Sequence, residues 1–244
     1  MKILVTGDKG FLGREFVQRY GNEYDVVGYD LKDGHDLLDY KTLSKNMKGC
    51  EQIVHLAAIP KPVVDKDFPE YFKHNVEGSL NVFRSALETG AKRVIYASST
   101  TIYGIEKGIP FQTPITESQP FVSQYLKADQ LSMRDADLSY HISKVMAEQI
   151  AAWFGLNKKV QTAALRFGPI NKVFLGTSVS INNATQAINL ALDYSGEFWY
   201  EAFSIVDEVP HINISKAKSI LGYEPEKPNY SPEQIHSTLE DRSR

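Results

Sequence analysis

Three glycines near the start of the chain place the tightest constraint on its fold. They are Gly7, Gly10 and Gly13 in the segment TGDKGFLG (residues 6–13), and they follow the apolar run at residues 2–5. At the junction of a buried strand and a helix, the first glycine permits a tight turn, the second lets the backbone approach a ligand, and the third lets the helix pack closely on the strand. The free N–H groups at the helix start bind anions. The segment therefore predicts a site for a dinucleotide pyrophosphate.

The rest of the chain alternates between apolar runs and amphipathic stretches, which predicts an α/β fold. Strand-like runs at 2–6, 25–29, 52–56, 93–98 and 160–165 alternate with helix-like stretches at 11–20, 39–47, 69–89 and 139–155. This order is typical of a doubly wound parallel sheet of the Rossmann type, with helices on both faces. Continuous apolar strands, such as residues 53–56, suit a sheet that is covered on both sides.

After Arg166 the pattern becomes irregular. We expect a helix near 182–194, a strand near 197–204, and helices near 215–221 and 232–240. The sequence thus predicts a nucleotide-binding domain at 1–165 and a smaller portion at 166–244 that completes the sheet and binds substrate.

Composition argues against several classes of function. The 244 residues carry a net charge of −3 and no run rich in Lys or Arg, so neither nucleic acid nor a membrane surface is an expected partner. The single cysteine, Cys50, has no partner for an internal disulfide. The six histidines show no spacing typical of a metal site, and we expect no metal. With no leader-like segment at the start, we expect a cytoplasmic protein.

An acidic residue at the end of the second predicted strand indicates which dinucleotide binds. Asp30 follows that strand and can accept hydrogen bonds from the ribose hydroxyls of the adenosine, but it would repel a ribose phosphate. It favours NAD over NADP. Where the second and third strands release the chain, we expect further contacts on the adenine side from Asp36, Leu37, Leu56, Ala57 and Ala58.

A tyrosine and a lysine four residues apart are candidates for proton transfer. Tyr140 and Lys144 fall on one face of a predicted helix. A lysine ammonium beside a phenol favours the phenolate and lowers its pKa, and such a tyrosine can take a proton from a substrate hydroxyl. Two other pairs share the spacing, Tyr103/Lys107 and Tyr223/Lys227, but Pro225 interrupts the second and no apolar periodicity follows the first.

Hydroxyl side chains end the fourth predicted strand. Ser98 and Ser99 lie where the carboxyl end of a parallel strand meets the ligand crevice, so one of them can hydrogen-bond the reacting oxygen. A serine at this position also commonly caps a turn.

Taken together, these motifs resemble the extended short-chain dehydrogenase/reductases, or NAD-dependent epimerase/dehydratase family, over residues 1–170. The resemblance rests on the glycine segment, HLAA at 55–58, NVEGSLNV at 75–82, SSTTIYG at 98–104 and the Tyr140/Lys144 pair. It implies that Ser99 is the catalytic hydroxyl, Tyr140 the general acid/base and Lys144 its partner. It also implies a homodimer formed through helices near 69–89 and 139–155. Coenzyme contacts are implied for Tyr140 and Lys144 and for Gly7, Lys9, Gly10, Phe11, Leu12, Gly13, Asp30, Asn75, Ala97, Ser98, Phe167, Gly168 and Pro169.

The chain departs from the family pattern at two places. Only 78 residues follow Arg166, and the usual Gly-Asp-Gly element is absent from the sequence, which disfavours a full nucleotide-sugar site. Residues 121–138 resemble an insertion, which we expect to roof the active site. Family dehydratases carry an acidic pair where this chain has Thr100 and Thr101, so dehydration is not expected.

These observations predict an enzyme that oxidises a secondary hydroxyl of a sugar or sugar derivative with NAD. Nucleotide-sugar epimerisation and dehydrogenation of a small sugar both fit, and the short C-terminal portion resembles the family's uronate dehydrogenases. Lys61, Arg134 and Lys172 are candidate partners for a substrate carboxylate. The alternative is a non-catalytic NAD sensor or scaffold, against which the intact set of Ser99, Tyr140 and Lys144 argues.

Overall fold

The computed structural model describes residues 1–105, 113–125, 135–174, 177–231 and 235–237. They form a six-stranded parallel sheet with the strand order β2-β1-β3-β4-β5-β7. Its strands are β1 (Lys2–Thr6), β2 (Asp25–Tyr29), β3 (Gln52–His55), β4 (Arg93–Ser99), β5 (Gln161–Phe167) and β7 (Glu201–Ile205). A separate two-stranded sheet pairs β6 (Val173–Phe174) with β8 (Ile235–Ser237).

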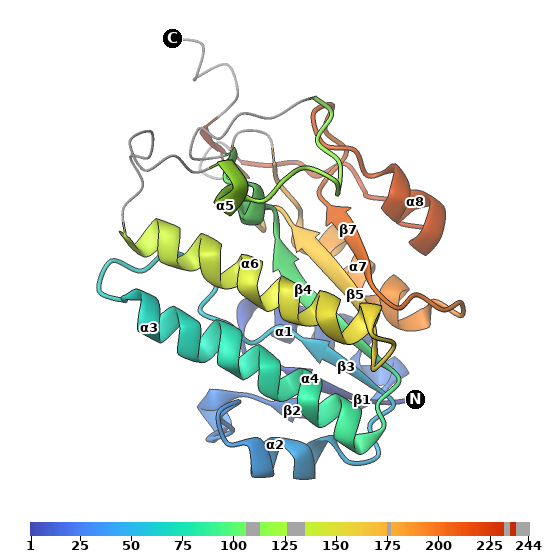
Figure 1. Cartoon of the computed structure of the whole chain (residues 1–244). Helices are drawn as coiled ribbons and strands as arrows, with labels where there is room; N and C mark the ends of the chain where they lie inside the picture. Colours follow the sequence, from blue (N-terminus) through green and yellow to red (C-terminus); the bar gives the residue numbers. More distant parts are fainter. Residues whose placement is uncertain (106–112, 126–134, 175–176, 232–234, 238–244) are drawn as a thin grey trace.

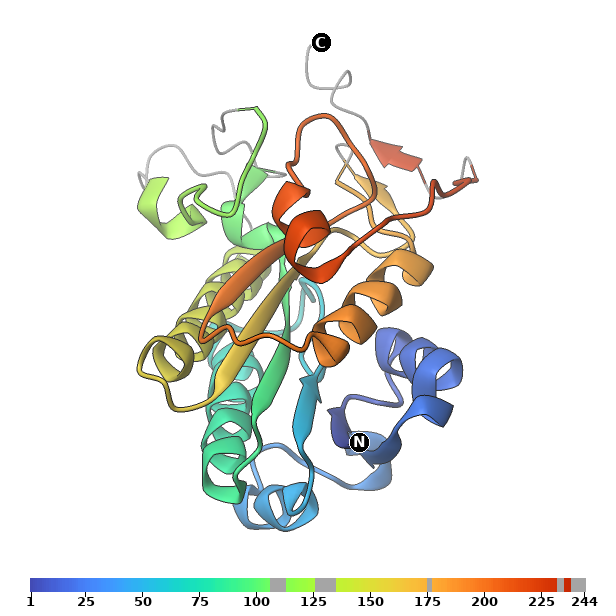
Figure 2. The same cartoon turned by 90° about the vertical axis from the view of Figure 1, so that its right-hand side faces the viewer.

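Helices cover both faces of the six-stranded sheet (Figures 1 and 2). On one face lie α2, α4 and α6, around a core that includes Phe83 and Phe154. On the other lie α1 and α7, around a core that includes Phe16 and Phe203. The helix bounds are α1 (Phe11–Tyr20), α2 (Tyr40–Met47), α3 (Phe68–Tyr71), α4 (Gly78–Thr89), α5 (Val122–Tyr125), α6 (Asp135–Leu156), α7 (Ile181–Asp193) and α8 (Ser215–Leu221). The predicted doubly wound α/β fold is confirmed.

The strand order determines where a ligand can bind. β1 has β2 on one side and β3 on the other, so the direction of chain winding reverses between β1 and β3. Thr6 pairs with Tyr29 of β2 and with His55 of β3, so the turns that follow all three strands lie together. In doubly wound sheets this switch point is the ligand crevice.

Several predicted elements differ from those observed. The helix expected over 69–89 is divided into α3, the π-helical turns η3 (Phe72–Glu77) and α4. The strand expected near 197–204 is shifted to Glu201–Ile205, where it pairs with β5. The helix expected near 232–240 is wrong for residues 235–237, which form β8, because pairing with β6 outweighs the local helix-start signal. Residues 232–234 and 238–240 of this expected helix lie outside the described part of the chain.

The region that resembled an insertion, 121–138, begins with α5 and ends in the first turn of α6. Residues 126–134 lie outside the described part of the chain, so the expectation that this region roofs the site stays a prediction. Among the described residues, none of the helices has the length and apolarity needed to cross a membrane.

Candidate active site

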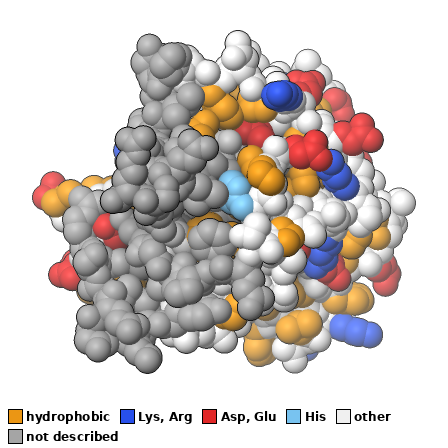
Figure 3. All heavy atoms as spheres, turned by 90° about the horizontal axis from the view of Figure 1, so that it is seen from above, with side chains coloured by type: hydrophobic (Ala, Val, Ile, Leu, Met, Phe, Trp, Pro, Cys, Tyr) orange, Lys and Arg blue, Asp and Glu red, His pale blue; other side chains and the backbone are white. Residues whose placement is uncertain are grey.

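A cavity of about 980 Å³ runs along the carboxyl ends of the strands at the switch point. Figure 3 views the molecule from above, and on its visible described surface basic and acidic side chains are interspersed, with neither sign dominant. The predicted site residues that line the cavity are Gly7, Gly10, Phe11, Leu12, Gly13, Asp30, Asp36, Leu37, Leu56, Ala57, Ala58, Ala97, Ser98, Ser99, Tyr140, Lys144, Phe167, Gly168 and Pro169. Predictions spread over more than 160 residues of sequence thus meet in one place.

The glycine turn leaves no room for side chains. Gly7 has φ +73°, and a Cβ there would lie 2.8 Å from the backbone nitrogen of Ala57. A Cβ on Gly13 would lie 2.1 Å from the Gly7 carbonyl oxygen, so α1 packs directly on the turn. Gly10 precedes α1, and no side chain caps this helix N-terminus. The N–H groups in the first turn of α1 are therefore available to bind an anion in the cavity, as the pyrophosphate of a dinucleotide requires.

The acidic residue at the end of β2 is fixed by backbone donors. Asp30 is 9% exposed and accepts hydrogen bonds from the backbone N–H groups of Lys9 (3.1 Å) and Lys32 (2.9 Å). The Lys9 side chain does not line the cavity, because its ammonium pairs with Asp33 at 2.9 Å. Asp30 thus stands at the cavity wall where an adenosine ribose is expected.

The loop after β3 is held from both sides. The backbone N–H groups of Leu56 and Ala57 each donate to Thr6 Oγ1 at 3.2 Å. Asn75, which does not line the cavity, accepts from the N–H of Ile59 (2.7 Å) and donates to the carbonyl of Ile59 (3.2 Å). Asn75 therefore shapes the cavity wall from behind.

His55 is a buried histidine with both ring nitrogens hydrogen-bonded. Nδ1 lies 2.8 Å from Thr6 Oγ1 and Nε2 lies 2.9 Å from Ser79 Oγ. Because the Ser79 hydroxyl donates to the Asn75 carbonyl, Nε2 is the ring donor and Nδ1 the acceptor, which describes a neutral imidazole. Burial, and secondly the charge of Lys144, lower the pKa of His55 to about 3.

Two elements bring the candidate catalytic residues to the cavity: α6 supplies Tyr140 and Lys144, and β4 supplies Ser99. Lys144 is 5% exposed, and its Nζ donates to the Ala97 carbonyl at 2.6 Å and lies 4.7 Å from the centre of the Tyr96 ring. Burial lowers the pKa of Lys144 to about 8, although the nearby Glu148 carboxylate opposes this change.

Ser99 caps a turn at the wall of the cavity. Its Oγ accepts from the backbone N–H of Thr101 (3.2 Å) and from Thr101 Oγ1 (2.9 Å), which caps the 3₁₀ turn η4 (Thr100–Tyr103). It also lines the cavity. The neighbouring Ser98 lines the cavity as well, but its hydroxyl donates to Glu148.

Other lining residues were not predicted as site residues. They are Tyr29, Leu31, Lys32, His35, Ile59, Pro60, Pro62, Lys66, His74, Thr101 and Ile170. Of the three candidate partners for a carboxylate, Lys61 lines the cavity, Lys172 does not, and Arg134 lies outside the described residues. No group of three or more His, Cys, Asp or Glu side chains suited to a metal ion occurs within the described ranges.

Comparison with known proteins identifies the family. The model of the NAD dependent epimerase/dehydratase family matches residues 3–170. The chain belongs to this family. Its coenzyme is accordingly NAD, for which the glycine turn, the uncapped start of α1 and Asp30 provide a fitting cradle.

Several curated relatives are named for sugar substrates, and others for a cinnamoyl-CoA or a hydroxysteroid. An L-arabinose 1-dehydrogenase (NAD(P)(+)) of Haloferax volcanii is 25% identical over 68% of this chain and 66% of its own length. A uronate dehydrogenase of Pseudomonas syringae is 26% identical over 78% of this chain and 69% of its own length. A UDP-glucose 4-epimerase of Lactobacillus helveticus is 26% identical over 68% of this chain and 51% of its own length. The chain thus spans about half to two thirds of the length of these relatives.

Solved structures share the fold. A short-chain dehydrogenase/reductase superfamily protein from Agrobacterium tumefaciens with bound NAD superposes with a TM-score of 0.77 at 19% identity, covering 93% of each chain. MoeE5 in complex with UDP-glucose and NAD superposes with a TM-score of 0.76 at 19% identity, covering 100% of this chain and 99% of the other.

Proposed function

We propose that this protein is an NAD-dependent enzyme that oxidises a secondary hydroxyl of a sugar or sugar derivative, as a dehydrogenase or as an epimerase. The observation that supports this most is the lining of one cavity by the glycine turn together with Ser99, Tyr140 and Lys144. A coenzyme cradle and a set of proton-transfer residues that share a cavity are what coupled hydride and proton transfer requires.

In this proposal each catalytic residue has a defined role. Tyr140 takes the proton of the substrate hydroxyl, and Ser99 hydrogen-bonds the same oxygen and orients it. Lys144 stabilises the Tyr140 phenolate through its ammonium group. The bound NAD supplies a hydride acceptor. The buried position of Lys144 supports its role, because a charge in a site that excludes water acts more strongly on its neighbours.

One residue of the cavity wall favours a free sugar acid as the substrate. Lys61 on the cavity wall is available to pair with a substrate carboxylate, as a free sugar acid would need. We therefore place dehydrogenation of a sugar or sugar acid first and epimerisation of a nucleotide sugar second.

An NADH-absorbance screen against free aldoses, uronic acids and nucleotide sugars tests the proposal. Net NADH formation with an aldose or uronic acid is the expected result for a dehydrogenase. A converted sugar without net NADH would identify an epimerase. No conversion in any of the three substrate classes, with NAD still bound, would instead favour a non-catalytic NAD sensor or scaffold.

We also propose that two copies associate through α4 and α6, which lie side by side on one face (Figure 1). Both helices expose apolar side chains: Leu87 is 45% exposed, Trp153 55% and Leu156 70%. The double variant Leu87→Glu/Trp153→Glu should shift the mass in light scattering from dimer to monomer. Val64→Glu, at a position that is 77% exposed outside these helices, should stay dimeric. A monomeric wild-type protein would contradict the proposal.

A further inference from the structure

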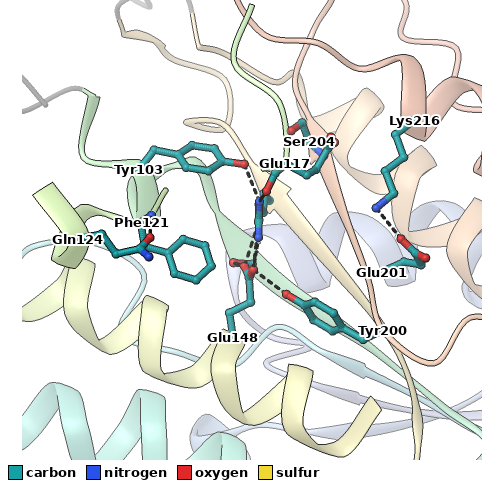
Figure 4. A network of polar contacts seen from close by, with 11 residues as sticks. Tyr103, Glu117, Phe121, Gln124, Glu148, Tyr200, Glu201, Ser204 and Lys216 are labelled. Carbon is teal, nitrogen blue, oxygen red and sulfur yellow. Dashed lines mark hydrogen bonds and ion pairs between the residues drawn. The ribbon is translucent and has the colours of Figure 1, made fainter. Parts of the chain in front are cut away.

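A fully buried carboxylate stands one helical turn beyond the candidate catalytic lysine. Glu148 on α6 has 0% exposure, and its oxygens receive hydrogen bonds from three residues outside this helix. Oε1 accepts from Arg166 Nη2 (2.5 Å) and from the Tyr200 hydroxyl (2.9 Å), and Oε2 accepts from the Ser98 hydroxyl. Figure 4 shows Glu148 and Tyr200 converging, with Tyr103 directed to the same network.

The positive charge of Arg166, which is 3% exposed, balances this carboxylate. Burial disfavours the charged guanidinium, but Glu148, Tyr103 and Tyr200 together outweigh this effect and raise the pKa of Arg166. The remaining Arg166 donors reach the Tyr103 hydroxyl (2.7 Å) and the Glu117 carbonyl (2.8 Å). A buried ion pair contributes little net stability compared with apolar packing. Its position beside the candidate catalytic residues therefore calls for another explanation.

Ser98 connects this ion pair to the cavity. It lies between Ala97, whose carbonyl accepts from Lys144 Nζ, and Ser99, the candidate catalytic hydroxyl. By accepting a hydrogen bond from Ser98, Glu148 thus fixes the end of β4, including the neighbouring residues Ala97 and Ser99.

We propose that Glu148 is a positioning residue for the reaction. Through Ser98 it holds the end of β4 so that Ala97 receives Lys144 and Ser99 faces the cavity, and its negative charge sustains the Lys144 ammonium. The inference rests on the proposed function only where it concerns turnover, because the placement and charge of Lys144 are measurable without a substrate.

The groups that contact Lys144 or interact with its charge come from three elements: His55 on β3, Tyr96 on β4 and Glu148 on α6. Tyr140, one turn earlier on α6, lines the same cavity. His55 is neutral, and burial raises the pKa of Tyr96, so that ring is neutral as well. Glu148 is therefore the charge that opposes the effect of burial on Lys144. Without it, the pKa of Lys144 should fall below about 8.

The charge is tested with Glu148→Gln, whose amide oxygen still accepts from Ser98. Competitive acetylation of Lys144 across pH, quantified by peptide mass spectrometry on the full chain, gives the titration midpoint of this lysine. We expect the midpoint to fall by about one pH unit in the variant. Tyr200→Phe removes one hydrogen bond to Glu148 but no charge, and should keep the wild-type midpoint. Equal midpoints in Glu148→Gln and wild type would overturn the electrostatic part of the proposal.

Should Glu148→Gln fail to fold because Arg166 is left unpaired, the double variant Glu148→Gln/Arg166→Met removes both buried charges. The loss of the Arg166 cation offsets part of the loss of the carboxylate, so the midpoint should fall by less than about one pH unit, and an unchanged midpoint would overturn the electrostatic part. The role of the Ser98–Glu148 hydrogen bond is tested with Ser98→Ala, which keeps the ion pair between Glu148 and Arg166. We expect kcat to fall about tenfold while the KM for NAD changes less than twofold. An unchanged kcat would overturn the claim that Glu148 positions the end of β4 through Ser98. A wild-type protein without turnover would refute the proposed function, and the acetylation midpoints would still decide the role of Glu148.

Discussion

The two ends of the cavity are built in different ways. At the coenzyme end, the glycine turn packs backbone against backbone, and a Cβ on Gly7 or Gly13 would meet main-chain atoms. At the catalytic end, side chains from α6 and β4 meet, and buried charges hold them from behind. The first end depends on the absence of side chains, whereas the second depends on their exact partners.

This difference decides how each end responds to substitution. At the coenzyme end, a side chain added to the glycine turn would clash with the backbone, so it should weaken NAD binding and lower the stability of the fold. A side-chain site fails when a functional group is removed, and its failure is visible in the rate. The predictions below use this contrast, from the largest expected effect to the smallest.

The catalytic end should lose rate and keep binding. Replacing Tyr140 with Phe removes the proposed proton acceptor, so kcat should fall roughly 10³-fold. The Kd for NAD should change little, because the glycine turn is untouched. Steady-state kinetics and fluorescence titration with NADH measure the two effects. Tyr24→Phe, at a tyrosine that hydrogen-bonds Asn189 on α7, is the matched control and should keep the wild-type rate. Near-normal turnover in Tyr140→Phe would remove this residue from the mechanism.

The coenzyme end should lose binding and stability together. In Gly13→Ala the new Cβ would lie 2.1 Å from the Gly7 carbonyl oxygen, so α1 must move away from the turn. We expect a loss of about 1–3 kcal/mol in the free energy of unfolding, and weaker NAD binding. In Gly10→Ala the nearest atom is 3.1 Å away, so stability should change less while NAD binding still weakens. Urea unfolding and NADH titration measure both, and equal stability losses in the two variants would contradict the packing argument.

Selectivity between the coenzymes should depend on the acidic residue at the end of β2. Asp30→Asn keeps an acceptor for the Lys9 and Lys32 amides but removes the charge that would repel a ribose phosphate. The kcat/KM ratio for NAD over NADP should therefore fall about tenfold. Asp25→Asn, at the exposed opposite end of the same strand, should leave the ratio unchanged. An unchanged ratio in Asp30→Asn would show that other residues set the selectivity.

The same contrast explains what the sequence could predict. The glycine turn, Asp30 and the apolar strands were recognised because their information lies in short contiguous segments. The Tyr140/Lys144 pair was recognised for the same reason. Glu148 and Arg166 were not assigned a partnership, because their contact joins a helix to a strand 18 residues away and follows no local pattern. Lys9 and Asn75 show the converse: the motif suggested contacts, but the side chain of one pairs with Asp33 and that of the other holds Ile59 from behind the wall.

His55 lies where the two ends meet, and the smallest predicted effect concerns it. It contacts Thr6 next to the glycine turn, and the charge of Lys144 at the catalytic end helps to lower its pKa to about 3. Since its ordinary pKa is 6.5, the unfolded chain binds a proton below that pH while the folded chain does not. The stability that depends on a neutral His55 is therefore fully present above about pH 6.5 and is lost as the pH falls toward 3. Between pH 7 and pH 6 it should decrease by about 0.7 kcal/mol. Urea unfolding at both pH values should show this slope in the wild type and a smaller one in His55→Asn. Equal slopes would mean that the His55 ring takes up a proton in the folded state. The residue between the coenzyme end and the catalytic end of the cavity would then not be neutral.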